Sequence, residues 1–143
     1  MMSVDFFVLG RPVPQGSMRA ILSKTTHQII MPTPPKLKAW RRTIAKAARP
    51  CFDIPFNAPV SLRCTFYLKP PQALPSWRRW PDKMPDLDKL VRAVDDALTG
   101  IAFDDDKRVV LIEARKIWGV REGVEISVRP LEQAEPQQVP LGV

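Results

Sequence analysis

The sequence predicts an α/β (α+β) fold in which a small mixed β-sheet is flanked by two main helices. Segments rich in β-forming residues alternate with two amphipathic segments that have helical spacing. The chain has 143 residues, of which 45% are hydrophobic, and this suits one core of ordinary domain size. We therefore expect a single domain over residues 1–130, followed by a flexible C-terminal tail over residues 131–143, whose prolines and glutamines lack periodicity.

The first third of the chain is expected to form a strand, a hairpin arm and a helix. Residues 3–9 are rich in β-formers, and the Gly and Pro residues of 10–16 predict a loop. Residues 17–32, which include TTHQIIM, are expected to form a short hairpin arm. Thr33 suits the N-cap of a helix that has proline in its first turn and continues to Ala48.

The remaining elements are expected to be three strands and a second helix. Residues 58–68 alternate as a strand does, and a proline-rich loop then leads into a helix over 86–99. The leucines and valines of that helix follow the spacing of a core face. Residues 109–118 and 123–130 predict two strands that are joined as a β-hairpin by the four residues between them.

Three observations bear on where the protein works. No run of 18 apolar residues is present, and the N-terminal stretch lacks the cationic start of a signal peptide, so no membrane partner is expected. Cys51 and Cys64 form no CxxC pair, which argues against a disulfide framework or zinc site and favours a reducing cytoplasm. His27 is the single histidine, and nothing near it favours nucleophilic catalysis.

Charge is distributed unevenly along the chain, whose net charge is +7. Residues 1–50 hold nine Lys or Arg and one acid, whereas residues 82–116 hold nine acids and seven Lys or Arg. A basic field attracts polyanions, chiefly through phosphates. An acidic cluster in such a protein would repel a bound phosphate unless a metal ion lay between them.

The acidic residues cluster in two places along residues 85–110. Asp86 and Asp88 lie at the expected helix entrance, and the run Asp104–Asp106 follows the helix. If the next strand returns toward the entrance, three carboxylates come together and can share Mg²⁺, which prefers oxygen ligands and phosphate substrates. Such a site hydrolyses phosphodiesters. Alternatively, the run is a solvated turn, Asp86 or Asp88 caps the helix, and Arg92 pairs with Asp88.

The same segment resembles a known family. PDLDKLVRAVDDALTG and the later FDDDKRVV are similar to the signature of the RusA family of Holliday-junction resolvases, roughly D-x-D-N-L-x-K-x-x-x-D-A-L followed by D-D-x-Q-V. GRPVPQGSMR, after the first strand, is also similar to members of that family. The resemblance implies a RusA-like nuclease that acts as a homodimer with Mg²⁺ (or Mn²⁺). It implies symmetric cutting of four-way DNA junctions, in the cytoplasm of a bacterial or phage-infected host cell.

The resemblance also assigns roles to individual residues. The family's acidic trio, which is catalytic and binds the metal, falls on Asp86, Asp88 and Asp106. Because the run has three aspartates, Asp105 is the second candidate for the third ligand. The family's catalytic lysine falls on Arg92, which keeps the positive charge but does not readily lose a proton.

Other positions differ from the family pattern or extend it. Lys89 stands where the pattern has Asn, Arg108 stands where it has Gln, and Asp96 matches the family's helix aspartate. Two further functions are therefore considered. One is a module that binds branched DNA but cuts it weakly or not at all. The other is a metal-dependent phosphohydrolase for small nucleotides, which the broad basic field disfavours.

Basic and aromatic residues supply candidate DNA contacts. Eight are predicted to bind DNA: Arg11, Arg19, Lys24, Arg78, Arg79, Lys89, Lys107 and Arg108. Lys36, Arg41 and Arg42, in the first expected helix, are additional candidates for phosphate contacts. Trp77 and Trp80, in the proline-rich loop, either stack on unpaired or distorted bases or anchor that loop to the core.

Overall fold

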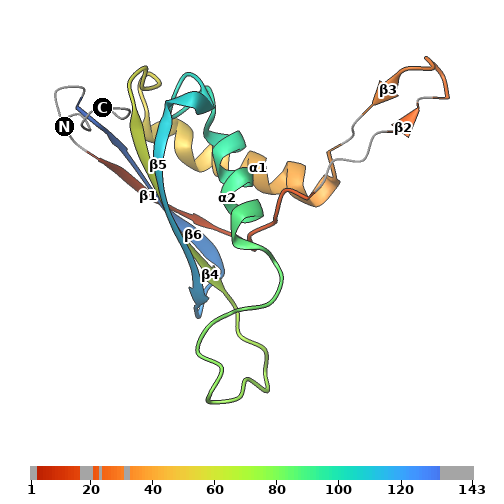
Figure 1. Ribbon diagram of the computed structural model, residues 1–143, viewed down its shortest axis with the longest axis vertical. Helices are drawn as coiled ribbons and strands as arrows, with labels where there is room; N and C mark the ends of the chain where they lie inside the picture. The colour runs from red at the N-terminus through yellow and green to blue at the C-terminus, as the bar shows by residue number, and fades with distance from the viewer. Residues whose placement is uncertain (1–2, 17–20, 23, 31–32, 133–143) are drawn as a thin grey trace, which may run out of the picture.

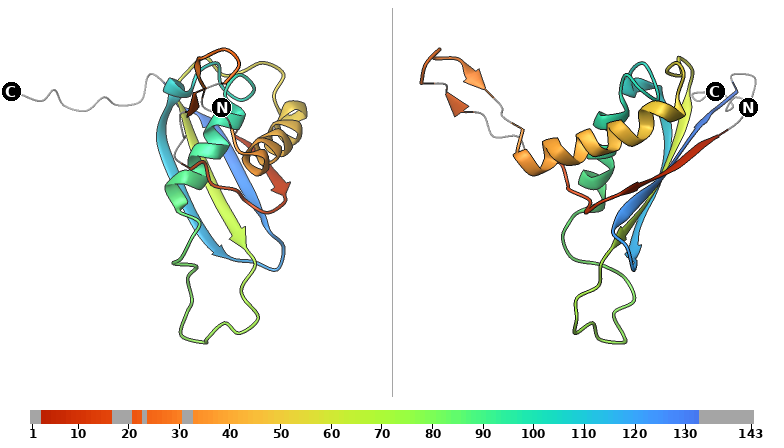
Figure 2. Two further views of the ribbon diagram at one scale, coloured as in Figure 1. Left: turned by 90° about the vertical axis from the view of Figure 1, so that its right-hand side faces the viewer. Right: turned by 180° about the vertical axis from the view of Figure 1, so that it is seen from behind.

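The computed structural model describes residues 3–16, 21–22, 24–30 and 33–132. Its centre is a four-stranded mixed sheet with two helices on one face, as Figures 1 and 2 show. This arrangement confirms the predicted α+β fold class. In the described part of the chain, no helix is long and apolar enough to cross a membrane.

The sheet has the strand order β1-β6-β4-β5. Its strands are β1 (Val4–Leu9), β4 (Val60–Leu68), β5 (Val109–Trp118) and β6 (Gly123–Pro130). β6 pairs antiparallel with both β1 and β4, whereas β4 pairs parallel with β5. Consequently β1 and β5 are the two edges of this sheet.

The predicted hairpin of β5 and β6 is wrong, because β4 lies between these strands. β4 takes the central position because its helix-facing side chains are fully buried and apolar: Val60, Leu62, Cys64 and Phe66. The link from β5 to β6 crosses the end of β4, where the Gly119 amide donates to the Leu68 carbonyl at 2.9 Å. A side chain at Gly119 would strike Tyr67, so only glycine fits this crossing.

The two helices cover one face of the sheet and pack against each other. α1 spans Pro35–Ala48 and α2 spans Leu87–Leu98. α2 buries six apolar residues, which is why the leucine and valine spacing predicted it correctly. α1 begins one position later than expected, because Pro34 rather than Thr33 is the N-cap residue and no side chain caps the helix.

The predicted arm is present in the described residues. β2 (Ile21–Leu22) pairs antiparallel with β3 (Ile29–Ile30), and Figure 1 shows this hairpin projecting beyond α1, away from the sheet. Residues 17–20, 23 and 31–32 lie outside the described residues, as does the tail from residue 133 onward.

Candidate active site and DNA-facing surfaces

Asp86 and Asp88 both lie at the entrance of α2 and are exposed. Asp86 occupies the N-cap position with extended backbone, yet its side chain makes no capping hydrogen bond. Its carboxylate instead lies 3.4 Å from the ammonium of Lys89. Asp88 lies in the first helical turn, where the helix dipole favours an anion. Capping therefore does not account for the Asp86 carboxylate, which remains accessible to a ligand.

The aspartate run lies at the other end of α2, just before β5. Asp104 is paired with Arg108 at 2.8 Å and 3.2 Å, and this hydrogen bonding lowers the pKa of Asp104. Asp105 caps the 3₁₀ helix Asp106–Arg108 by accepting from the Lys107 amide at 2.9 Å, which lowers the pKa of Asp105. Local donors thus stabilise two members of the run as anions.

Asp106 has the opposite electrostatic character. Its pKa is raised, first by a hydrogen bond shared with Asp105 and then by the negative charges of Asp105 and Asp96. A carboxylate held beside other carboxylates gains the most from a cation. Asp106 therefore lies beside two other carboxylates, those of Asp105 and Asp96.

Asp95 was missed by sequence reasoning. Its carboxyl is half-buried, and in the described part of the chain its buried Oδ1 has no hydrogen-bond partner. Burial, followed by the negative charges of Asp106 and Asp96, raises the pKa of Asp95 to about 6. The signal available in the sequence was its helical position, seven residues after Asp88 and thus on the same side of α2.

The carboxylates consequently form two groups, one at each end of α2. Asp88 and Asp95 are about 10 Å apart along the helix axis, at about 1.5 Å per residue. Across the described residues of one chain, no three Asp, Glu, His or Cys side chains are grouped so that they could hold a metal ion. A single chain therefore does not bring Asp106 together with Asp86 and Asp88.

Arg92 lies between the two acidic groups. It is exposed, four residues after Asp88 and four before Asp96. Among the salt bridges of the described residues, Arg92 does not form the pair with Asp88 that the helical spacing allowed. Its guanidinium is thus available on the exposed side of α2, where the sequence analysis placed it.

A basic groove of about 780 Å³ adjoins the acidic group at the end of α2. Four cations of α1 and the turn after it line this α1 groove: Lys38, Arg41, Arg42 and Arg49. Asp96 lines the same groove from α2, so a carboxylate and four cations line one groove from different helices. Arg41 and Arg42 were anticipated from the sequence, whereas Lys38 and Arg49 were not singled out.

The residues predicted to contact DNA are found in different environments. Four are exposed on loops or turns: Arg11, Lys24, Arg79 and Lys107. Lys89 and Arg108 pair with Asp86 and Asp104, as described above. Arg78 is held by Asp82 at 3.1 Å and its side chain is only 13% exposed, so its main contacts are within the protein. Arg19 lies outside the described residues.

Comparison with known proteins identifies the family. The family model described as "Endodeoxyribonuclease RusA" matches residues 10–129. A Bacillus subtilis (strain 168) protein named "Uncharacterized protein YqaN" is 28% identical over 139 residues, covering 88% of this chain and 95% of the relative. A Lactococcus phage r1t protein named "Crossover junction endodeoxyribonuclease rusA" is 32% identical over 79 residues, covering 54% of this chain and 58% of the relative. The chain belongs to the RusA family of endodeoxyribonucleases.

Proposed function

We propose that this nuclease resolves four-way (Holliday) junctions by paired phosphodiester hydrolysis that depends on magnesium, with manganese as a substitute. The observation that carries the proposal is the arrangement along α2. Carboxylates near both of its ends flank Arg92, and the α1 groove supplies four cations beside Asp96. The name of the phage relative supports the substrate, because that protein is called a crossover junction endodeoxyribonuclease.

The carboxylates suit a hard divalent cation in chemistry. The Asp86 side chain makes no capping bond, and a buried oxygen of Asp95 has no partner among the described residues. The pKa of Asp106 is raised by its neighbours. Asp86, Asp88 and Asp106 would hold the metal, with Asp105 as the second candidate for the third position. When bound, Mg²⁺ supplies a polarised phosphoryl oxygen and a water of lowered pKa.

The residues of the chain contribute binding and orientation. The cations of the α1 groove bind the DNA backbone and fix its register, since phosphate contacts position a duplex without reading its sequence. Arg92 places a positive charge where negative charge builds up on the phosphate during attack. Asp95 and Asp96 extend the anionic surface, and a bound cation reduces their repulsion of a nearby phosphate.

Paired cutting requires two sites, and we propose that the protein acts as a homodimer. The edge strand β5 has three consecutive apolar residues that are exposed: Val110 at 61%, Leu111 at 47% and Ile112 at 52%. An exposed apolar edge strand is a ready surface for pairing with another chain. Two-fold pairing places two equivalent sites on one junction. One chain does not group Asp86, Asp88 and Asp106 among its described residues. The metal site that we propose therefore requires either a second copy of the chain or a movement of these residues when the cation binds.

A second candidate function is a module that binds branched DNA and cuts it weakly. The specific observation in its favour is Lys89, whose ammonium competes for a carboxylate oxygen of Asp86 at 3.4 Å. In either case we place the protein with DNA in the cytoplasm of a bacterial or phage-infected cell, which the phage relative supports.

The deciding experiment incubates the protein with a labelled mobile four-way junction, with and without Mg²⁺ or Mn²⁺. We expect symmetric cuts with either cation and binding alone without one. Asp88→Asn is expected to abolish cutting while keeping or tightening binding, because less negative charge faces the phosphates. Asp53→Asn, an exposed aspartate elsewhere, is the matched control and is expected to cut normally.

Two outcomes separate the candidates. Binding without cutting in both cations eliminates the resolvase and leaves the binding module. In that case Lys89→Asn, which restores the family pattern, is expected to recover cutting by freeing Asp86. Normal cutting by Asp88→Asn would show that the site is wrongly assigned, even if the protein is a nuclease.

A further inference from the structure

Two tryptophans are exposed on the loop 69–85, which connects β4 to α2. Trp77 is 77% exposed and Trp80 is 61% exposed, whereas Trp40 in the core is 4% exposed. Figure 1 shows the loop projecting beyond the sheet at the end where α2 begins, and both views in Figure 2 agree. Trp77 and Trp80 therefore do not anchor the loop to the core. Exposed aromatic surface of this extent is typical of a binding site.

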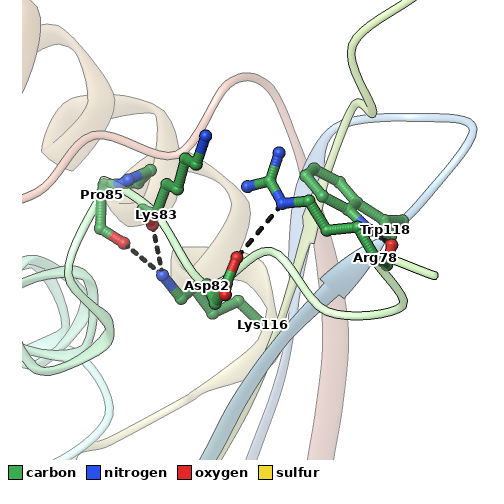
Figure 3. Close-up of polar contacts among 6 residues, drawn as sticks. All are labelled: Arg78, Asp82, Lys83, Pro85, Lys116 and Trp118. Carbon is green, nitrogen blue, oxygen red and sulfur yellow. Dashed lines mark hydrogen bonds and ion pairs between the residues drawn. The ribbon is translucent and has the colours of Figure 1, made fainter. Parts of the chain in front are cut away.

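A different tryptophan anchors the loop. The Arg78 guanidinium lies 5.2 Å from the centre of the Trp118 ring of β5, and the Trp118 indole N–H donates to the Arg78 carbonyl at 3.3 Å. Arg78 also donates to Asp82 at 3.1 Å, which lowers the pKa of Asp82 (Figure 3). Arg78 thus fixes the backbone between the two exposed tryptophans.

A second anchor holds the end of the loop. The Lys116 ammonium, also on β5, donates to the carbonyls of Lys83 at 2.7 Å and Pro85 at 2.8 Å, as Figure 3 shows. Within the loop, the Asp82 amide donates to the Trp80 carbonyl at 2.9 Å. Because the loop is held in place before any ligand arrives, little conformational entropy is lost when the tryptophans engage a partner.

The position and charge of the loop identify that partner. The loop holds four cations and one acid: Lys69, Arg78, Arg79, Lys83 and Asp82. A second copy of so basic a loop is repelled, whereas a polyanion is attracted. Trp80 is six residues before Asp86, the first carboxylate of the candidate site. Indole rings stack on nucleic-acid bases of any sequence, and each stack strengthens binding substantially.

We propose that Trp77 and Trp80 form a fixed stacking platform for the bases that border the branch point of a DNA junction, where base pairs lose a stacking neighbour. The proposal rests on the proposed resolvase function and gives it a source of selectivity. Duplex DNA keeps its bases stacked and offers none to the platform, whereas bases at a branch point are unstacked at lower cost. Selectivity for branched over linear DNA then resides in the loop, while the α1 groove binds the phosphates of either.

The test compares affinities for a four-way junction and for a duplex of the same sequence, without divalent cation so that nothing is cut. We expect Trp77→Ala and Trp80→Ala each to weaken junction binding by about tenfold or more and to leave duplex binding unchanged. Trp77→Phe and Trp80→Phe are expected to keep most of the preference. Ile54→Ala removes an exposed apolar side chain outside this loop, 78% exposed, and is expected to change neither affinity.

Three other results would overturn the proposal. Alanine variants that bind junctions normally show that the tryptophans are not a platform. Equal losses on junction and duplex show a general contact instead. Alanine variants that change the sedimentation of the free protein show that the loop binds a second protein chain. In each case, if the wild-type protein still prefers junctions over duplex, the proposed resolvase function is unaffected. A wild-type protein without that preference would refute both the stacking platform and the resolvase function.

Discussion

At the scale of single residues, Asp95 carries a charge in an unfavourable place. Its pKa rises from the ordinary 3.8 to about 6, through burial first and then through Asp106 and Asp96. Between about pH 4 and pH 6 the unfolded chain ionises this carboxyl while the folded chain keeps it protonated, so stability falls as pH rises through that window. Taken at face value, this pKa shift corresponds to about 3 kcal/mol. Because the carboxyl is only half-buried, solvent screening reduces the effect, and we expect Asp95→Asn to raise the free energy of unfolding at pH 7.5 by about 1 kcal/mol.

The measurement is urea unfolding of both proteins at pH 7.5 and pH 4.5, without divalent cation. The stability advantage of asparagine should be clearly smaller at pH 4.5, where only part of the folded-state penalty has developed. Asp53→Asn, at an exposed position elsewhere in the chain, is the matched control. An equal gain from Asp95→Asn at both pH values would mean that packing, rather than charge, is responsible.

Substitutions of Arg92 test the chemistry that we propose for the exposed face of α2. It is exposed, and the resemblance predicts that it stands in place of the family lysine, so its replacement should affect the reaction and not the fold. We expect Arg92→Ala to lower the rate of junction cutting by about 100-fold to 1000-fold, as loss of one transition-state charge contact does elsewhere. Arg92→Lys should retain most of the rate. Single-turnover cutting measures both, and normal cutting by Arg92→Ala would exclude the assigned role.

At the scale of elements, the antiparallel pairing of β1 with β6 depends on one glycine. Gly123 pairs with Leu9, and a Cβ placed on it would overlap the Phe7 ring and the Val8 carbonyl oxygen. We expect Gly123→Ala to destabilise the fold by about 1–3 kcal/mol, since overpacking forces backbone shifts. Gly16→Ala is the control, because a Cβ there meets nothing within 4 Å. Thermal unfolding compares the two, and equal melting temperatures would contradict the expectation.

Local sequence patterns predicted the helices and strands well but could not predict which strands lie next to each other in the sheet. The buried face of α2 followed from leucine and valine spacing, and β5 and β6 were found at their observed limits. Their order in the sheet was missed because short links favour hairpins, whereas burial of the apolar strand β4 decides which strand is central.

The candidate site was predictable where its signal is local. Asp86 and Asp88 are recognisable from their spacing at a helix entrance. Asp95 was not, because the sequence gives no measure of its burial against Asp106. The structural role of Arg78 was also hidden, since Trp118, on which it rests, is 40 residues away in the chain.

At the scale of the whole molecule, α2 connects the surfaces that a branched DNA would touch. The loop with Trp77 and Trp80 precedes its entrance, and the α1 groove adjoins its far end. In the proposed resolvase, a DNA strand that reaches both surfaces would pass along the exposed face of α2, over Asp88 and Arg92. The phosphate to be cut would then lie between a branch-point contact and a backbone contact, with a separation set by the length of α2.

The paired cutting that we propose requires two sites, and we expect a dimer to form at the edge of β5. Ile112→Lys places a charge in the exposed apolar stretch of β5, and charges on edge strands oppose pairing. Wild type should sediment as a dimer and convert a cruciform plasmid directly to linear DNA. Ile112→Lys should sediment as a monomer and yield nicked circles, since each monomer would cut one strand at most. Val120→Lys adds the same charge at a residue that is 97% exposed outside the strands, and it should behave as wild type. If Ile112→Lys still sediments as a dimer, the interface does not lie at the edge of β5.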